Sequence, residues 1–429
     1  MKRRDFLVSM GAAGAALGLP LSFSSCGSSG SGGNGNKVTI NWWHIQTTDP
    51  GKTMWQTYAN QYMQAHPNVK INITVIENQS FKQKLTTVMQ AGTPPDLFQS
   101  WGGGVLFQYA KAGLVQDLTS ALQGSWGSTF NTNALNVYAQ NGKNYGAPYD
   151  MGCVTFWYNK SLFAKANIKQ TPKTWTDLLS TIQQLQSAGI TPLSLGEKDQ
   201  WPGMYWWAYL SIRLGGKDAF MKAINRTGSF ADPPFVQAGQ YIQQLAALNP
   251  FQRGYLGETY TQEYTEMGNG QAAMELMGSF ALANDRSAAP NGKAPEMDIF
   301  PFPMVEGGAG SPTDVFGGGG GFAIGKNAPP ETVDFLKFLL SPSHVNDFVK
   351  SGFQPVFKGT EKAQTNPQLL EVQQMTTNAN YFQLYYDQYF PASVDPVILD
   401  QTQGLYARTV TPMAAAKAID DAVASALNQ

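Results

Sequence analysis

Short β-rich runs alternate with helical patterns along most of this chain, and that alternation restricts its fold more than any other feature. Residues 38–43 form a β-rich run, residues 54–66 follow a helical pattern, and residues 69–76 alternate apolar and polar side chains. Further helical stretches and short apolar runs follow, and a second series begins near residue 145. This order predicts an α/β protein whose sheets are mostly parallel and flanked by helices.

One helix in the second series has a clear start signal. Thr174 offers a hydroxyl cap and Asp177 an early negative charge, ahead of Leu178, Ile182 and Leu185 at helical spacing. Gly189 marks its end. An alanine-rich pattern over 412–427 predicts another helix near the C-terminus.

Composition excludes several classes of protein. Only 14% of the 429 residues are charged, 12% are aromatic, and 29 basic residues balance 30 acidic ones. Disorder is a poor interpretation of such a chain, and a nucleic acid partner would need a basic face. Few charges and many aromatic rings instead fit a surface that recognises a neutral, hydroxyl-rich molecule such as a carbohydrate.

The N-terminus has the pattern of an export signal. Basic Lys2, Arg3 and Arg4 precede a small, apolar stretch that is too short to anchor in a bilayer. We therefore interpret residues 1–25 as an export signal. The paired arginines fit either twin-arginine or general secretory export, and the sequence leaves both routes open.

Cys26 follows two serines and precedes Gly27, as at a lipoprotein processing site. Phe23 departs from the usual leucine three positions before the cysteine. Residues 27–36 are nearly all glycine and serine, a composition that makes residues 26–36 a flexible tether. We expect lipid attachment at Cys26, and a protein in the periplasm or on the outer face of the cytoplasmic membrane.

Six motifs, in this order and at this spacing, give the chain a specific resemblance. They are AGTPPDLF at 91–98 with YAKAGLVQDL at 109–118, YGAPY at 145–149, WYNKSLF at 157–163, PKTWTDLL at 172–179, GQAAM at 270–274 and GSF at 278–280. Nearly the whole of the chain beyond the tether resembles the family 1 extracellular solute-binding proteins, the sugar-capturing components of bacterial ATP-binding-cassette importers.

The resemblance implies two α/β lobes that enclose a ligand by hinge closure. Residues 37–148 plus 304–351 would form one lobe, and residues 149–303 plus 352–429 the other. The chain would cross between them near 145–149, 299–304 and 352–356. The function implied is capture of a mono- or oligosaccharide and its delivery to a membrane permease, without catalysis or cofactor. We expect a monomer.

Aromatic rings at strand ends are the first candidates for sugar contacts, because a sugar ring has an apolar face and a hydroxyl rim. Alternation along the first strand assigns Trp42 to the core and leaves Trp43 for the cleft. Trp101 follows another short strand and precedes three glycines. Trp201 and Tyr205 belong to the densest aromatic cluster in the chain, and Trp201 is the strongest of the aromatic candidates.

Other candidates rest partly on the resemblance. Tyr149 and Asp150 lie just beyond the first crossing, where relatives often place contacts, and a carboxylate accepts two hydroxyl hydrogen bonds. Phe280 stands where many relatives carry tryptophan. Asp314 precedes five glycines whose amides could donate to ligand oxygens. Each of these residues has a structural alternative, as a core or turn residue.

Two further chemistries find little support. The three histidines are scattered, so no metal site is predicted, and packing explains Tyr385 and Tyr386 better than iron binding does. The glycine run lacks the strand and helix context of a phosphate loop.

Two other functions stay open. A secreted glycoside hydrolase would need two carboxylates about 5 to 10 Å apart, such as Asp150 with Asp314. A polyamine receptor would need an acidic cleft.

Overall fold

The computed structural model describes residues 37–290 and 293–427. The predicted export signal, Cys26 and the tether over residues 26–36 lie outside the described residues.

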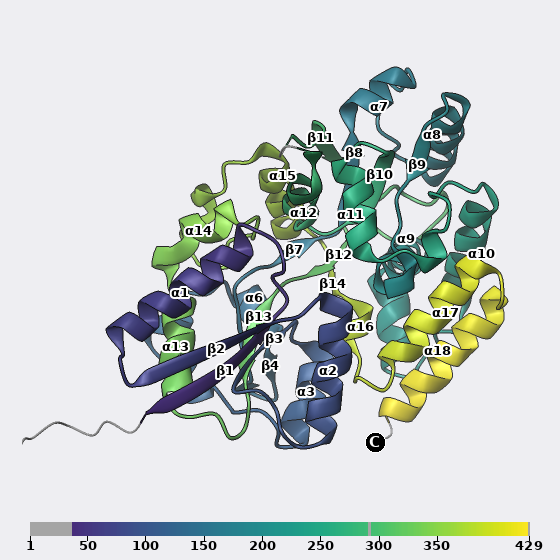
Figure 1. Cartoon of the computed structure of the whole chain (residues 1–429). Helices are drawn as coiled ribbons and strands as arrows, with labels where there is room; N and C mark the ends of the chain where they lie inside the picture. The colour runs from purple at the N-terminus through teal and green to yellow at the C-terminus, as the bar shows by residue number, and fades with distance from the viewer. Residues whose placement is uncertain (1–36, 291–292, 428–429) are drawn as a thin grey trace, which may run out of the picture. The chain divides into compact units, whose positions relative to one another are not determined.

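A five-stranded sheet organises the first lobe, the name used here for the elements packed on this sheet (Figure 1). Its strand order is β2-β1-β3-β13-β6. The bounds are β1 Val38–His44, β2 Val69–Val75, β3 Leu97–Ser100, β6 Ala147–Pro148 and β13 Gly321–Ile324. Strand β1 runs parallel to β2 and β3, whereas β13 runs antiparallel to β3 and β6.

Helices cover both faces of this sheet. Trp42 of β1 points into a core shared with α1 and α13, and Phe98 of β3 points into a second core on the opposite face, with α2 and α3. Strict alternation along each strand produces this division. The helices of this lobe are α1 Gly51–Ala65, α2 Asn78–Gln90, α3 Gly103–Lys111, α13 Glu331–Leu339 and α14 Val345–Lys350.

A four-stranded sheet of order β11-β8-β10-β9 organises the second lobe. The bounds are β8 Thr155–Asn159, β9 Thr191–Leu193, β10 Ala272–Met277 and β11 Met297–Phe300. Strand β8 is antiparallel to both β10 and β11, and only β9 pairs with β10 in parallel. The α/β prediction is confirmed, but both sheets are mixed rather than mostly parallel. Antiparallel neighbours arise where a strand enters from a connecting segment instead of a helical crossover.

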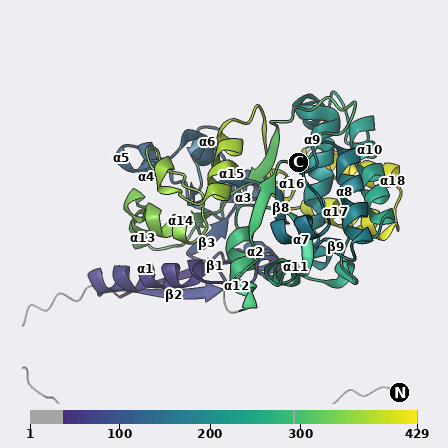
Figure 2. The same ribbon diagram turned by 90° about the horizontal axis from the view of Figure 1, so that it is seen from above.

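Eight helices of the described chain belong to the second lobe. Figure 2 shows α10, α17 and α18 near one another on the outer side of this lobe. The largely buried α9 packs against α10 and α17. The predicted helix start at Thr174 is confirmed, since the Thr174 hydroxyl and the Asp177 carboxylate form a reciprocal capping box. The bounds are α7 Lys160–Lys165, α8 Trp175–Ser187, α9 Trp201–Ile224, α10 Pro233–Ala247, α11 Tyr260–Gly268, α12 Ala281–Ala288, α17 Asp395–Ala407 and α18 Pro412–Leu427.

A three-stranded sheet of order β14-β12-β7 is built from segments that connect the two lobes. Its strands are β7 Gly152–Cys153, β12 Val315–Gly318 and β14 Phe382–Leu384, with α15 Pro367–Thr377 and α16 Tyr386–Tyr389 alongside. Shorter elements complete the described chain: α4 Thr119–Leu122, α5 Ser125–Ser128, α6 Thr132–Asn136, β4 Ala139–Gln140, β5 Lys143–Asn144 and four short 3-10 turns, Glu197–Asp199, Tyr255–Gly257, Pro342–His344 and Glu361–Ala363.

The connecting segments differ from the predicted crossings at two points. Phe353, Val356 and Phe357 pack in the core that β1 shares with α1 and α13, so the chain is still in the first lobe at 352–356. Ile299 and Phe300 pair with β8 inside the second sheet, so the chain does not leave that lobe at 299–304. The buried Arg213 side chain of α9 holds the segment that follows, through the carbonyls of Phe302, Ser311 and Asp314. Residues 304–314 therefore contact the second lobe, and the chain reaches the first sheet only at β13.

Among the described residues, none of the helices combines the length and the apolar character that crossing a bilayer requires.

Candidate functional site

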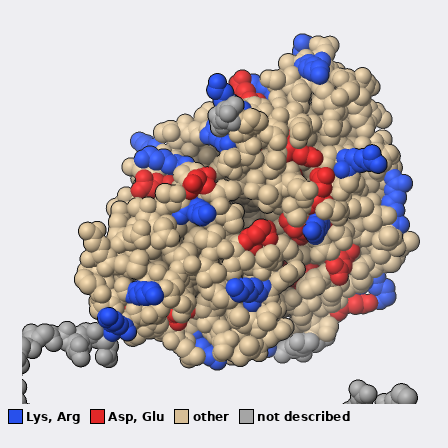
Figure 3. All heavy atoms as spheres, in the orientation of Figure 1, with Lys and Arg blue, Asp and Glu red and all other residues tan. Residues whose placement is uncertain are grey.

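A cavity of about 130 Å³ lies at the carboxyl ends of β1, β2 and β3. The residues that follow these strands, Gln46, Glu77 and Trp101, form one wall, and the opposite wall comes from the start of α9 and from α11 and α12. In the orientation of Figure 1, the space-filling view of Figure 3 shows a hollow near the centre of this face. Open α/β sheets bind ligands at the carboxyl ends of their strands, so we call this cavity the ligand cleft.

Aromatic rings form most of the second lobe's side of the cleft. Trp201, the first residue of α9, is 3% exposed, and its ring centroid lies 4.8 Å from Tyr260 and 5.3 Å from Tyr205. Its indole Nε1 is buried without an acceptor among the described residues. Tyr205 in turn stacks on Tyr385, with centroids 5.2 Å apart and planes 6° from parallel. The wall thus offers flat apolar surface together with a free donor.

Polar side chains connect the two walls of the cleft. The Thr48 hydroxyl, after β1, donates to Asn284 Oδ1 of α12 over 3.1 Å, and Asn284 Nδ2 donates to the Tyr260 hydroxyl over 3.0 Å. On the floor, the Tyr149 hydroxyl donates to Gln99 Oε1 over 3.0 Å. These neutral groups combine donors and acceptors, as a hydroxyl-rich ligand requires.

Asp150, in the segment between β6 and β7, is a buried carboxylate of the cleft, at 8% exposed. Its Oδ1 accepts a hydrogen bond from the Gln354 backbone N–H at 2.5 Å. Burial raises the pKa of Asp150 to about 7, although the backbone N–H groups of Gln354 and Met151 oppose that shift. The group therefore changes charge near neutral pH.

We expect ligand binding to strengthen as pH rises from about 5.5 to 8. Ligand hydroxyls that donate to Asp150 favour the ionised form, so binding below a pKa of about 7 must first release a proton. Asp150→Asn should remove this pH dependence, which calorimetric titration at several pH values would detect. Equal pH dependence in both proteins would exclude Asp150 as a ligand contact.

Six of the eight predicted site residues line the cleft. They are Trp101, Tyr149, Asp150, Trp201, Tyr205 and Phe280. Trp43 lies outside the cleft, because its side chain points from the face of β1 toward α2, where Lys84 Nζ sits 4.5 Å from the ring centroid. The cleft begins only beyond the strand end, at Ile45.

Asp314 is also outside the cleft. Its carboxylate accepts a hydrogen bond from the Ser311 N–H at 2.8 Å and closes a turn, and its carbonyl binds Arg213. The structure therefore does not bring Asp314 to the cavity that Asp150 lines.

Several cleft residues were missed in the sequence. Gln46 lies in the polar stretch after the first strand, so the strand-end rule could have found it. Lys82, Asp387, Tyr260 and Asn284 sit on helices with no distinguishing local pattern, and only the tertiary fold brings them to the cavity.

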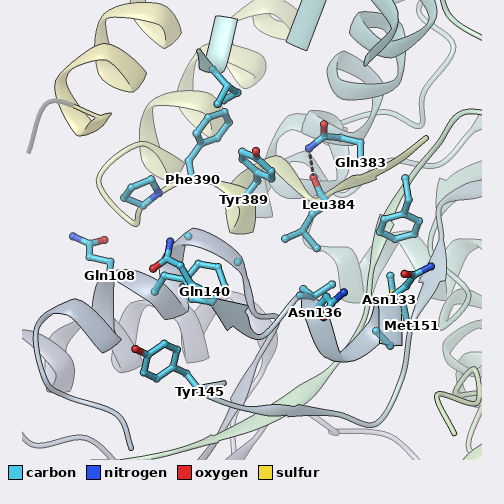
Figure 4. Close-up of a pocket in the computed structure, with 18 of the residues that line it drawn as sticks. Gln108, Asn133, Asn136, Gln140, Tyr145, Met151, Gln383, Leu384, Tyr389 and Phe390 are labelled. Atoms are coloured by element: carbon cyan, nitrogen blue, oxygen red, sulfur yellow. Dashed lines mark hydrogen bonds between the residues drawn. The ribbon is translucent and has the colours of Figure 1, made fainter. Parts of the chain in front are cut away.

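A second, larger hollow of about 1350 Å³ lies elsewhere between α3 and the segments around β14 and α16. Figure 4 shows its lining, with Tyr145 and Gln108 on one wall and Tyr389 and Phe390 on the other. It contains none of the eight predicted site residues. It also lacks the strand ends that position polar groups in the smaller cavity, so we assign the ligand to the smaller one.

Two α/β lobes with a polar, aromatic cleft at the strand ends define a receptor for small solutes. Residues 45–345 match the family model of bacterial extracellular solute-binding proteins, and this chain belongs to that family.

Curated relatives include an uncharacterised extracellular-binding protein of an ABC transporter from Pyrococcus horikoshii. It is 27% identical over 62% of this chain and 60% of its own length. The diacetylchitobiose-binding protein of Streptomyces coelicolor is 24% identical over 85% of this chain and 84% of its own.

Among solved structures, one from a study of xylan utilization by Caldanaerobius polysaccharolyticus is 29% identical, with a TM-score of 0.84 over 90% of this chain and 99% of that one. A chitin oligosaccharide binding protein has a TM-score of 0.83 at 22% identity, over 92% of this chain and all of that one. At that identity the second likeness supports the fold alone.

Proposed function

We propose that this chain captures a neutral mono- or oligosaccharide outside the cytoplasm and delivers it to an ATP-binding-cassette permease. The sugar would bias the two lobes toward the closed form, which the permease would recognise. The observation that carries this proposal is the composition of the cleft, in which aromatic rings lie opposite groups that donate and accept hydrogen bonds.

The carboxylates of the cleft are held by hydrogen bonds within the chain. Each carboxylate of the cleft already accepts a hydrogen bond or an ion pair from within the chain: Asp49 from Thr53, Glu77 from Gln79 and Ser80, Asp150 from Gln354, and Asp387 from Lys82. Within the described chain only Asp387 of these is paired with a cation, so the aromatic wall of the cleft, rather than its charge, favours a sugar over a polyamine.

The names of the relatives support a carbohydrate. Diacetylchitobiose is the named ligand of the Streptomyces coelicolor relative, and xylan utilization is the subject of the study that yielded the 29% identical structure. These relatives share about a quarter of their aligned residues with this chain. At that level of identity they favour a sugar as the class of ligand, and the particular sugar has to be identified by experiment.

We infer binding without catalysis. The pair of carboxylates considered for a hydrolase, Asp150 and Asp314, does not meet in the cleft, since Asp314 closes a turn elsewhere. The other buried carboxylate of the cavity, Asp387, is neutralised by Lys82 at 2.6 Å. A monomer tethered through Cys26 outside the cytoplasmic membrane completes the proposal.

Thermal unfolding against a panel of ligands tests the function. The panel would contain xylotriose, N,N′-diacetylchitobiose, galactose, raffinose, amino acids and polyamines. A ligand at 100 times its Kd stabilises the protein by about 2.7 kcal/mol, which raises the Tm by a few degrees for a chain of this size. Stabilisation by a saccharide that chromatography recovers unaltered supports the proposal. Consumption of the sugar would favour a hydrolase, and stabilisation by polyamines alone would contradict a carbohydrate receptor.

Lipid attachment is tested separately by Cys26→Ser. Without the thiol no acyl group can be attached, so we expect the variant to leave the membrane fraction and appear in the soluble exported fraction. Cell fractionation with immunodetection makes the measurement, and Cys153→Ser serves as the matched control because Cys153 is buried in the fold. Continued membrane association of the Cys26 variant would exclude the anchor.

A further inference from the structure

Lys82 and Asp387 form an ion pair that lines the ligand cleft and joins distant parts of the chain. Lys82 lies on α2 and Asp387 on α16, and Lys82 Nζ is 2.6 Å from Asp387 Oδ2. Their side chains are 15% and 5% exposed. Surface pairs are weak because water screens them, but this one is held largely away from bulk water beside the cavity.

The pair retains hydrogen-bonding capacity toward the cavity. Asp387 Oδ2 accepts from both Lys82 Nζ and, over 2.8 Å, Gln388 Nε2, so Oδ1 keeps no donor among the described residues. The ammonium group has three N–H donors, and Asp387 is its one hydrogen-bond acceptor in the described chain. The pair therefore presents a free acceptor next to free donors.

The Lys82 side chain stays protonated in this environment. Burial alone would lower the pKa of Lys82, but attraction to Asp387 and Asp395 outweighs burial and raises it. The pair is net neutral, so the carboxylate would repel an anionic ligand group and the ammonium group would repel a cationic one. Hydroxyl groups, which both donate and accept, suit the two atoms together.

Trp101 completes the arrangement. Lys82 Nζ lies 5.3 Å from the Trp101 ring centroid, and the edge of Phe81 packs against the same ring with centroids 5.9 Å apart. A sugar ring placed against Trp101 would thus bring its hydroxyl rim close to the ion pair.

We propose that Lys82 and Asp387 together bind two adjacent hydroxyl groups of the captured sugar, one donating to Asp387 Oδ1 and the other accepting from Lys82 Nζ. This inference rests on the proposed function, and it assigns to that site a requirement for a neighbouring pair of hydroxyls beside Trp101.

Calorimetric titration of the full-length protein tests the pair, with xylotriose, N,N′-diacetylchitobiose and galactose as probes. We expect Lys82→Gln and Asp387→Asn each to weaken binding of the recognised probe by roughly 10- to 100-fold, the range for a hydrogen bond to a charged group in a desolvated site. Lys84→Gln is the matched control, since Lys84 sits on the same helix over the ring of Trp43 and outside the cleft. It should leave Kd unchanged.

Monodeoxy derivatives of the recognised probe separate contact from positioning. If Lys82 binds one hydroxyl, the penalty of Lys82→Gln should vanish for the derivative that lacks that hydroxyl. A penalty that persists for every derivative would overturn the inference, because Lys82 would then act only by holding the fold. Should Lys82→Gln fail to fold, Lys82→Arg keeps the ion pair while displacing its donors, and carries the same test.

The outcomes distinguish failure of this inference from failure of the proposed function. If the unmodified protein binds a probe and all variants bind it equally, the hydroxyl-binding pair is overturned while the sugar receptor stands. If the unmodified protein binds none of the three saccharides, both the inference and the proposed ligand class for these probes are overturned.

Discussion

Replacement of Trp201 by alanine is expected to weaken sugar binding by about 1 to 3 kcal/mol, or roughly 5- to 150-fold in Kd. The ring is 3% exposed, lines the cleft and packs against Tyr260 and Tyr205, so its loss removes both apolar surface and a free indole donor. Calorimetric titration with the sugar identified in the ligand panel measures the change.

The same substitution leaves a hole in a packed wall and is expected to destabilise the protein as well. Trp201→Phe keeps most of the packing while removing the indole donor, and should retain stability with an intermediate affinity. Trp43→Ala is the matched control, because Trp43 lies outside the cleft beside Lys84. Unchanged affinity in both Trp201 variants would remove this residue from the binding site.

Three buried carboxyl groups are expected to make the stability of the protein depend strongly on pH. Glu275 of β10, Asp285 of α12 and Glu263 of α11 are all buried, at 0%, 0% and 1% exposed. Burial raises the pKa of Glu275 to about 8, and burial together with repulsion from Glu275 raises the pKa of Asp285 and of Glu263. The folded protein therefore holds protons that the unfolded chain releases near pH 4.5.

We expect the free energy of unfolding to decrease as pH rises from about 5 to 8. Between the unfolded and folded pKa values the folded state binds more protons, so the stabilisation is fully present below about pH 4.5 and is lost as pH rises through about 8. The expected loss is on the order of 2 to 5 kcal/mol. Denaturant unfolding at pH 5, 6.5, 8 and 9 measures it.

Glu275→Gln should flatten this pH dependence, because glutamine cannot ionise. Glu296→Gln provides the control, since that side chain is 72% exposed and its only ion pair is with Lys160 at the surface of the described chain. A free energy of unfolding that stays constant or rises from pH 5 to 8 would contradict the presence of buried protonated carboxyls.

Local patterns predicted much of the fold. The hydrophobic periodicity placed β1, α1 and β2 correctly, and the Thr174 hydroxyl with Asp177 marked a helix start that the structure confirms. Such signals act over a few residues, which is why they can be read in a sequence. Strand direction in the second sheet depends on how distant segments meet, so no local pattern revealed that β8 is antiparallel to its neighbours.

The same limit applies to the site. Trp101, which follows a strand, Tyr149, at the first crossing, and Trp201, in the dense aromatic cluster, line the cleft, and their contact with a sugar stays a prediction. Trp43 lies outside the cleft. Alternation along a strand decides which face of the sheet a side chain points from, whereas the cleft lies beyond the end of the strand. Lys82 and Asp387 are 305 positions apart, and only the tertiary fold shows that they meet.

A solved structure of the protein with its saccharide bound would test the central claim most directly. The account predicts one intact sugar ring in the cleft, in contact with Trp201 and beside the Lys82 and Asp387 side chains. A sugar bound instead in the larger hollow of Figure 4, between the walls that carry Tyr145 and Tyr389, would contradict the assignment of the site.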